Sequence, residues 1–272
     1  KYSEEQHPIT VRGLYYQAEV HGIAGITKDE KDYTKIQRQV LQLRRDHHLP
    51  YSHIADATRY MRKPSSHDNM EKALANTINT YRRALWQEQD WAVEVWIEKS
   101  ALAGVIYEVT AEYDVPLMPT AGYTSETFAY EAVAAYVGSG KTLAILAMYD
   151  FDRSGRDATN SLKEKVMRFG AELGVQVDFE QIALNPQQIQ FLDLPTREPK
   201  RTSAADKNWE YDFACELDAM TPNDLRELVR VHIEAFLPSG ELDALREVES
   251  LERSQAVKFF NAFHGTQRQD DG

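Results

Sequence analysis

The sequence predicts a multi-domain α/β protein in which a small helical domain precedes a larger domain built on a mostly parallel sheet. Residues 1–90 show short helical patterns separated by polar breaks. From residue 91 onward, apolar strand-like runs alternate with helical segments. Alternating β and α segments are typical of a parallel sheet covered by helices. The length of 272 residues suits two domains of modest size.

Three short helices are expected near the N-terminus. The segment 9–22 has Thr10 as a helix N-cap and Gly22 as a stop. The segment 28–48 carries an apolar stripe of helical period at Tyr33, Ile36, Val40 and Leu43. A third helix is expected within residues 49–63. Three short helices with one basic face favour a helix-turn-helix or winged-helix module, and a plain helical bundle with a solvated basic face is the alternative.

The whole chain is expected to have three parts: residues 1–68, a connecting helix over 69–90, and the α/β part with a helical extension over 91–272. The third part is expected to hold strands in residues 91–97, 115–122, 141–149, 175–184 and 210–217. Its helices are expected in residues 98–113, 125–137, 157–174, 221–237 and 241–263.

The net charge of −12 is unevenly distributed along the chain. Residues 1–90 hold fourteen Lys and Arg against twelve Asp and Glu, whereas the remainder holds 17 against 31. This split permits nucleic-acid binding by the first part and cation binding by the second. The single cysteine, Cys215, excludes an internal disulfide and suits a reducing cytoplasm. No apolar run approaches the roughly 18 residues that a membrane span needs, so a cytoplasmic protein without a membrane partner is expected.

Residues 138–142, GSGKT, look like the end of a phosphate-binding loop. The full motif needs a glycine where Ala135 stands. A helical segment precedes these glycines and a strand follows them, which reverses the order that forms a phosphate site at a helix N-terminus. We therefore interpret the segment as a helix stop before a strand, and no nucleotide cofactor is expected.

Acidic residues follow two of the expected strands. Asp150 and Asp152 come directly after one strand, and Glu98 follows another. Ligands of open α/β sheets bind outside the carboxyl ends of the strands. Two carboxylates two residues apart in extended backbone point to the same side, where they can share a hard cation such as Mg²⁺. A metal site is expected here if the two strands are neighbours.

The segments EVWIEKSAL and YDFDRSGRD resemble the TOPRIM domain of topoisomerases and primases, which has a glutamate after one strand and Asp-x-Asp after a later one. Type IIA enzymes often carry a third acid where this sequence has Ser154. This difference favours similarity to the type IIB branch.

The segment TVRGLYYQ resembles the R-[DE]-x-[YF]-Y motif in the winged-helix domain of topoisomerase VI A subunits and the related meiotic double-strand-break proteins. The motif arginine corresponds to Arg12 and the nucleophilic tyrosine to Tyr16, while Gly13 stands where the family prefers an acid. Helical spacing places Arg12 and Tyr16 on one face and Tyr15 on another, packed face. The likeness covers roughly residues 9–237 and extends to the short "mini-A" relatives of phages and plasmids.

The resemblance implies a DNA-cleaving transesterase of the type IIB A-subunit class. Tyr16 would attack a DNA phosphodiester and retain a 5′-phosphotyrosyl link, with Arg12 stabilising the phosphoryl oxygens. Glu98, Asp150 and Asp152 would hold Mg²⁺, for which Mn²⁺ can substitute. The residues that would contact the phosphates of double-stranded DNA are Lys31, Lys35, Arg38, Arg45, Arg59, Arg62 and Lys63.

The same resemblance implies a homodimer that makes paired cuts, with nucleophile and metal site on different protomers, and a separate ATPase subunit of the B type as partner. Two alternatives remain open. A TOPRIM nuclease would hydrolyse DNA with metal-activated water, and Tyr16 would be structural. A non-catalytic DNA-binding protein of phage or plasmid maintenance would need no tyrosine.

Overall fold

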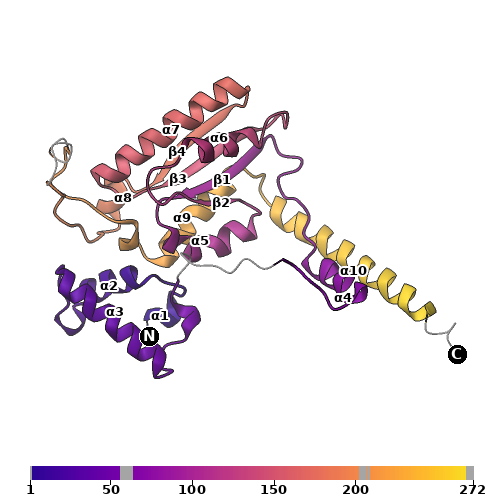
Figure 1. Cartoon of the computed structure of the whole chain (residues 1–272), viewed down its shortest axis with the longest axis horizontal. Helices are drawn as coiled ribbons and strands as arrows, with labels where there is room; N and C mark the ends of the chain where they lie inside the picture. The colour runs from indigo at the N-terminus through magenta and orange to yellow at the C-terminus, as the bar shows by residue number, and fades with distance from the viewer. Residues whose placement is uncertain (1, 56–63, 202–206, 208, 268–272) are drawn as a thin grey trace. The chain divides into compact units, whose positions relative to one another are not determined.

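The computed structural model describes residues 2–55, 64–201, 207 and 209–267, which form two compact units (Figure 1). The first unit comprises Lys1–Arg59 with Asp90–Phe236, and the second comprises Tyr60–Gln89 with Leu237–Gly272. Within the described ranges, none of the helices combines the length and the apolar character needed to cross a membrane.

In the described part of the first unit, four strands form one sheet in the order β2-β1-β3-β4. The strands are β1 (Trp91–Ile97), β2 (Leu117–Pro119), β3 (Thr142–Met148) and β4 (Val177–Ala183). All their pairings are parallel, which confirms the predicted α/β class and parallel sheet. The central strands β1 and β3 are neighbours, and Ile97 at the end of β1 is opposite Met148 at the end of β3.

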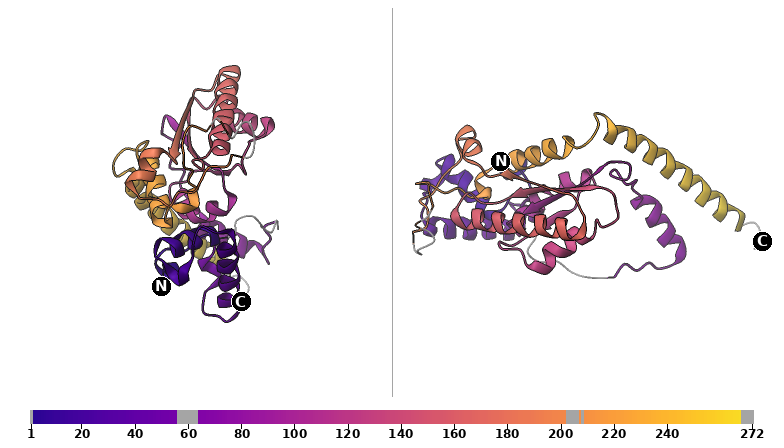
Figure 2. Two further views of the ribbon diagram at one scale, coloured as in Figure 1. Left: turned by 90° about the vertical axis from the view of Figure 1, so that its left-hand side faces the viewer. Right: turned by 90° about the horizontal axis from the view of Figure 1, so that it is seen from above.

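Helices cover both faces of this sheet. Helix α6 packs against α7, and α5 packs against α9; Figure 1 shows the two pairs on opposite sides of the strands, and Figure 2 shows α7 running along the sheet. The helices are α5 (Ser100–Glu112), α6 (Glu126–Ala134), α7 (Arg153–Leu173), α8 (Pro186–Phe191) and α9 (Pro222–Glu234). Because β3 is covered on both faces, its residues Leu143–Met148 are all buried, as its unbroken apolar run predicts.

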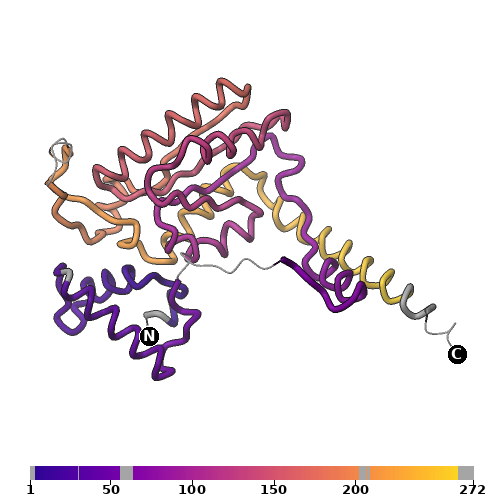
Figure 3. The backbone as a smooth tube through the Cα atoms, viewed as in Figure 1, coloured from indigo at the N-terminus to yellow at the C-terminus, as the bar shows by residue number. Residues whose placement is uncertain are grey.

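The N-terminal helices of the first unit form a small cluster of their own. They are α1 (Tyr2–Glu5), α2 (Val11–Val20) and α3 (Glu30–Arg45), with 3-10 turns at Ile23–Gly25 and Tyr51–His53. Helices α2 and α3 contact each other and are the indigo helices of Figure 3. Thr10 caps α2 as predicted, because its hydroxyl accepts a hydrogen bond from the Gly13 N–H at 2.8 Å. The buried core of this cluster is Ile9, Val40, Leu49 and Ile54.

Two predicted elements differ from the structure. The helix expected in residues 49–63 is a single 3-10 turn at Tyr51–His53 in its described part, because Ile54 then extends and pairs with Ile9; residues 56–63 lie outside the described part. The strand expected in residues 210–217 forms two isolated bridges, Phe151 with Cys215 and Arg197 with Ala214. A 3-10 turn, Leu217–Ala219, follows directly and prevents a longer ladder.

The second unit contains α4 (Met70–Thr80) and α10 (Glu241–Gln267), which contact each other. The connecting helix expected over residues 69–90 is shorter, because α4 ends at Thr80. Tyr81 extends instead, and its hydroxyl donates to Glu252 of α10 at 2.7 Å. The neighbouring Arg83 also binds Glu252, at 2.7 Å. Contacts with a distant helix therefore end α4 early.

Candidate functional site

The three acids predicted from the sequence lie together at the carboxyl ends of β1 and β3. The main-chain N–H of Glu98 donates to the Met148 carbonyl at 2.9 Å, which continues the strand pairing by one residue. The carboxylate of Glu98 then accepts a hydrogen bond from the Asp150 N–H at 3.0 Å. The neighbouring strands assumed by the sequence argument are present, and they bring Glu98 to the first aspartate.

The two aspartates are held by different main-chain groups. One carboxylate oxygen of Asp150 accepts from the buried Leu217 N–H at 2.8 Å. Asp152 is the N-cap of α7, and its carboxylate accepts from the Gly155 N–H at 2.8 Å. Glycine is required at position 155, because a Cβ there would lie 2.2 Å from the Asp150 carbonyl oxygen. The turn that places both aspartates therefore depends on Gly155.

Sequence reasoning missed a lysine in the middle of these acids. Lys99 Nζ lies 3.1 Å from Asp150, 2.9 Å from Glu216 and 2.9 Å from Asp218. The lysine directly follows Glu98 at the end of β1, so its backbone position brings its side chain to the same edge of the sheet. The sequence could have indicated Lys99 as a site residue, because it directly follows Glu98.

Two acids and one arginine from the segment after β4 were also missed. Arg197 binds Asp152 at 2.8 Å and Glu216 at 3.3 Å. Glu216 and Asp218 follow a bridge to Phe151, which brings them beside β3. Glu216 and Asp218 lie at the end of the segment 210–217, which was predicted to be a strand. A search for acids at the carboxyl ends of predicted strands, which identified Glu98, could therefore have identified them too.

Helix α2 brings the predicted arginine and tyrosine to this charged cluster. Arg12 binds Glu216 at 3.1 Å, and its guanidinium lies 5.7 Å from the centroid of the Tyr16 ring. Thr10, the cap of the same helix, donates its hydroxyl to Asp218. Tyr16 is 5% exposed and Tyr15 is 4% exposed, and the Tyr15 hydroxyl donates to the Thr27 carbonyl at 3.0 Å. The Arg12 guanidinium lies almost as close to the Tyr15 ring, at 5.6 Å, and both tyrosines are buried, so the expected separation of a packed Tyr15 from Tyr16 is not seen.

Burial raises and neighbouring cations lower the pKa values of the acids, and the balance differs between Asp150 and Glu216. Burial raises the pKa of Asp150 to about 7; Lys99 opposes this rise and Glu98 adds to it. Burial would also raise the pKa of Glu216, but Lys99 and Arg12 outweigh it and lower that pKa to about 2. Burial, followed by the charge of Glu216, raises the pKa of the Tyr16 phenol above its ordinary value.

The donor chemistry of the cluster fits a hard divalent cation. Five carboxyl groups meet three cationic side chains, so acids outnumber cations by two, and oxygen ligands are those that Mg²⁺ prefers. The carboxylates belong to Glu98, Asp150, Asp152, Glu216 and Asp218, and the cations are Arg12, Lys99 and Arg197. Across the described ranges, no three His, Cys, Asp or Glu side chains already converge as metal ligands, and the Lys99 ammonium holds Asp150, Glu216 and Asp218.

The predicted phosphate-contacting residues on α3 are accessible. Lys31, Lys35, Arg38 and Arg45 are all exposed, and Lys35 pairs with Asp32 one turn before it. Arg59, Arg62 and Lys63 lie outside the described residues. In the glycine segment, Gly138 and Gly140 have φ of 76° and 73° between α6 and β3, the conformation of a helix stop and turn that the sequence predicts.

Comparison with known proteins gives no family assignment. None of the family models compared matches the chain. No curated protein matches it either. The site must therefore be interpreted from its own residues.

Proposed function

We propose that the protein is a metal-dependent DNA-cleaving transesterase in which Tyr16 is the nucleophile. The observation that carries this proposal is a continuous set of contacts from the tyrosine to the acids. The Arg12 guanidinium lies 5.7 Å from the Tyr16 ring centroid, Arg12 binds Glu216, and Lys99 binds both Glu216 and Asp150. A phenol beside an arginine and a group of carboxylates has the parts needed for phosphoryl transfer.

In this reaction the Tyr16 hydroxyl oxygen forms a bond to phosphorus, and the bond from phosphorus to the 3′-oxygen breaks. The phenol proton is finally carried by the 3′-hydroxyl that leaves, while the 5′-phosphate stays on the tyrosine. The positive charge of Arg12 opposes the rise in the pKa of the Tyr16 phenol and so favours the phenolate. Once DNA is bound, the same guanidinium can stabilise charge on the phosphoryl oxygens.

Glu98, Asp150 and Asp152 are the residues proposed to hold Mg²⁺ or Mn²⁺. A bound divalent cation would neutralise the phosphate and stabilise the leaving oxygen. Lys99 must then give up its contact with Asp150, which its long side chain permits. Glu216 and Asp218 keep the lysine at the site after this exchange, since both also bind it.

We further propose that the sheet is a TOPRIM domain and that the N-terminal helices are of the winged-helix type. A homodimer acting on double-stranded DNA, with a separate ATPase subunit, would follow from the same family relationship. In the structure, Arg12 contacts Glu216 of its own chain, so a complete site within one protomer is the simpler arrangement to test first. Mixing a Tyr16→Phe chain with an Asp150→Asn chain tests this, because sites shared between protomers would restore cleavage.

The burial of Tyr16 favours one rival function. A phenol that is 5% exposed with a raised pKa is a poor nucleophile until DNA binding rearranges it. A nuclease would use the same acids to activate water and would leave free 5′-phosphates.

Substitution of Tyr16 distinguishes the transesterase from the nuclease. Tyr16→Phe removes one oxygen and retains the ring, so folding and DNA affinity should persist while the covalent protein–DNA product disappears. Tyr15→Phe is the matched control and should still form it, because Tyr15 bonds to a loop carbonyl. Cleavage in Mg²⁺ is followed with and without protease digestion. Undiminished cutting by Tyr16→Phe with free 5′-phosphates would establish the nuclease, and a protease-sensitive link in that variant would exclude Tyr16 as the nucleophile.

A further inference from the structure

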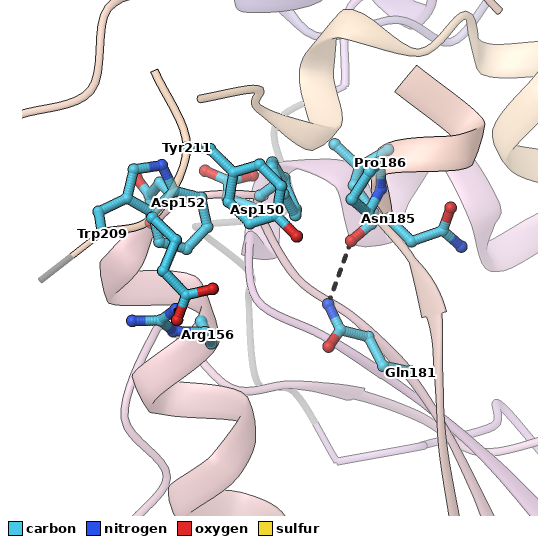
Figure 4. A pocket seen from close by; sticks show the side chains of 11 residues that line it. Asp150, Asp152, Arg156, Gln181, Asn185, Pro186, Trp209 and Tyr211 are labelled. Carbon is cyan, nitrogen blue, oxygen red and sulfur yellow. Dashed lines mark hydrogen bonds and ion pairs between the residues drawn. The ribbon is translucent and has the colours of Figure 1, made fainter. Parts of the chain in front are cut away.

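A cavity of about 310 Å³ opens beside the acids (Figure 4). Asp150 and Asp152 contribute to its wall, so whatever occupies it lies next to the proposed metal site. This volume is at the lower end of the range for small-molecule sites. The chain's proposed chemistry uses the acids but assigns nothing to the cavity.

One side of the cavity is aromatic. Trp209 and Tyr211 line it, with ring centroids 5.3 Å apart, and both pack against Phe151 at 5.0 Å and 4.8 Å. The Trp209 indole N–H donates to the Phe213 carbonyl at 2.9 Å, which fixes the ring. Trp209 is 4% exposed, whereas Tyr211 is half-buried. Tyr211 therefore offers the accessible part of a rigid aromatic surface.

A cation, an acid that pairs with it and two amides also line the cavity; Arg156 lies 3.8 Å from the Glu210 carboxylate. The guanidinium of Arg156 lies 4.9 Å from the Trp209 ring centroid. Figure 4 shows Asn185 and Gln181 across from the two labelled aromatic rings. The Asn185 side-chain oxygen accepts from the Gln188 N–H at 2.9 Å, and the Gln181 amide donates to the Leu184 carbonyl at 3.4 Å. Side-chain amides held in this way can hydrogen-bond the polar edge of a planar ligand.

We propose that this cavity binds one unstacked nucleobase of the DNA strand whose phosphate lies at the acids. The assignment rests on the proposed function, since it takes the acids as the place of the phosphate. Every base has a π-face that can stack on an aromatic ring, and this contact is tolerant of sequence. The base must leave the duplex to enter, so the substrate class is DNA with an unpaired or easily unpaired nucleotide at the cleavage position.

A free nucleotide carries the same base and phosphate chemistry as a strand, so the first measurement compares ligands on the full-length wild-type protein in Mg²⁺. The ligands are 2′-deoxyadenosine 5′-monophosphate, 2-deoxyribose 5-phosphate, and two single-stranded oligonucleotides, one intact and one with abasic sites throughout. Each ligand with bases should bind about tenfold more tightly than its partner without them. Equal affinity within both pairs would overturn the proposal. A preference confined to the mononucleotide would overturn the assignment to a DNA strand.

The second measurement places the base in the cavity. Tyr211→Leu retains apolar bulk but removes the ring, so the preference for ligands with bases should fall about tenfold, while Tyr211→Phe should retain it. Tyr107→Leu, which removes an exposed aromatic from α5, is the matched control and should change nothing. Unfolding midpoints show whether each variant is folded. A folded Tyr211→Leu chain with the full base preference would refute the site.

The two measurements distinguish a wrong assignment of the nucleobase site from a wrong assignment of the transesterase activity. If base preference depends on Tyr211 but no covalent DNA product forms, the base site stands and the transesterase does not. If the covalent product requires Tyr16 and no base preference exists, the transesterase stands and the base site is wrong.

Discussion

Asp150 and Tyr16 both face the same charged cluster, but different parts of the molecule hold them. Asp150 follows a strand whose residues Leu143–Met148 are all buried, and main-chain N–H groups bind both its own carboxylate and that of Glu98. Tyr16 lies on the ten-residue helix α2, whose contacts with the acids are made by side chains. The position of the acids therefore depends on strand register, and the position of the tyrosine depends on the packing of α2 and on side-chain contacts to the acids.

This difference suggests a division of roles. A site fixed by a buried parallel sheet keeps its geometry when single side chains change. A short helix that reaches the acids only through side-chain hydrogen bonds and ion pairs is easier to displace from them, and substrate DNA can rearrange such contacts. We therefore expect the acid side to be the constant part of the site and the tyrosine side to be the adjustable part.

The largest expected effect comes from the acid side. Asp150→Asn and Glu98→Gln keep the size of each side chain and remove its charge, so cleavage in Mg²⁺ should fall at least about 100-fold. Folding should be nearly unchanged, because removing one of several clustered like charges relieves repulsion. Cleavage rates across a Mg²⁺ titration, with unfolding curves alongside, provide the test. Wild-type cleavage by either variant would remove these acids from the mechanism.

A smaller effect on activity, with a large effect on stability, is expected at Gly155. The added methyl of Gly155→Ala would lie 2.2 Å from the Asp150 carbonyl oxygen, so the start of α7 must move. Overpacking of this kind costs about 3 kcal/mol, which denaturant unfolding would measure. Ser154→Ala changes the exposed neighbour and should be almost neutral. An unchanged unfolding midpoint for Gly155→Ala would mean that the turn carrying the aspartates is more adjustable than we argue.

Substitutions that disturb the position of Tyr16 should reduce stability and covalent product less strongly. A conservative substitution at the same position should retain both. Thr10→Val removes the α2 cap and the hydroxyl that binds Asp218. Loss of a cap costs about 1 kcal/mol, and the displaced helix should form less covalent product. Thr10→Ser retains the hydroxyl and should behave like the wild type. If Thr10→Val lost no stability and no covalent product, these polar contacts would not be what positions Tyr16.

The smallest effect is expected at the glycine segment. Lys141→Ala should leave DNA cleavage within about twofold of wild type, because the glycine segment is interpreted as a structural turn. The stability should also change little, since surface substitutions alter it by only about 0.5 kcal/mol. ATP binding by the full-length protein, measured by calorimetry, should be absent in both wild type and variant. Saturable ATP binding that disappears in Lys141→Ala would instead identify a nucleotide site there.

Local sequence pattern predicted the four strands of the sheet, their parallel arrangement and the meeting of Glu98 with Asp150, because an apolar run bounded by acids determines which residues end a buried strand; the fifth expected strand, 210–217, forms only isolated bridges. It could not predict that Arg12 meets Glu216, or that Thr10 meets Asp218, since more than 200 residues separate each pair along the chain. The early end of α4 at Thr80 has the same origin, because Glu252 binds the residues that follow it. Lys99 was overlooked although it is adjacent to Glu98, because a cation is not expected among metal-binding acids.

Asp152 has two functions in one side chain, since it faces the charged cluster and also caps the first turn of the 21-residue helix α7. These functions constrain the position differently over evolutionary time. A descendant that lost its chemistry would no longer need a carboxylate at position 152, but its helix would still need a cap, so Asp, Asn, Ser or Thr would persist there. At Glu98, where no helix is capped, a wider range of residues could accumulate. Comparing these two positions in related chains would therefore show whether a lineage still performs the reaction or has kept only the fold.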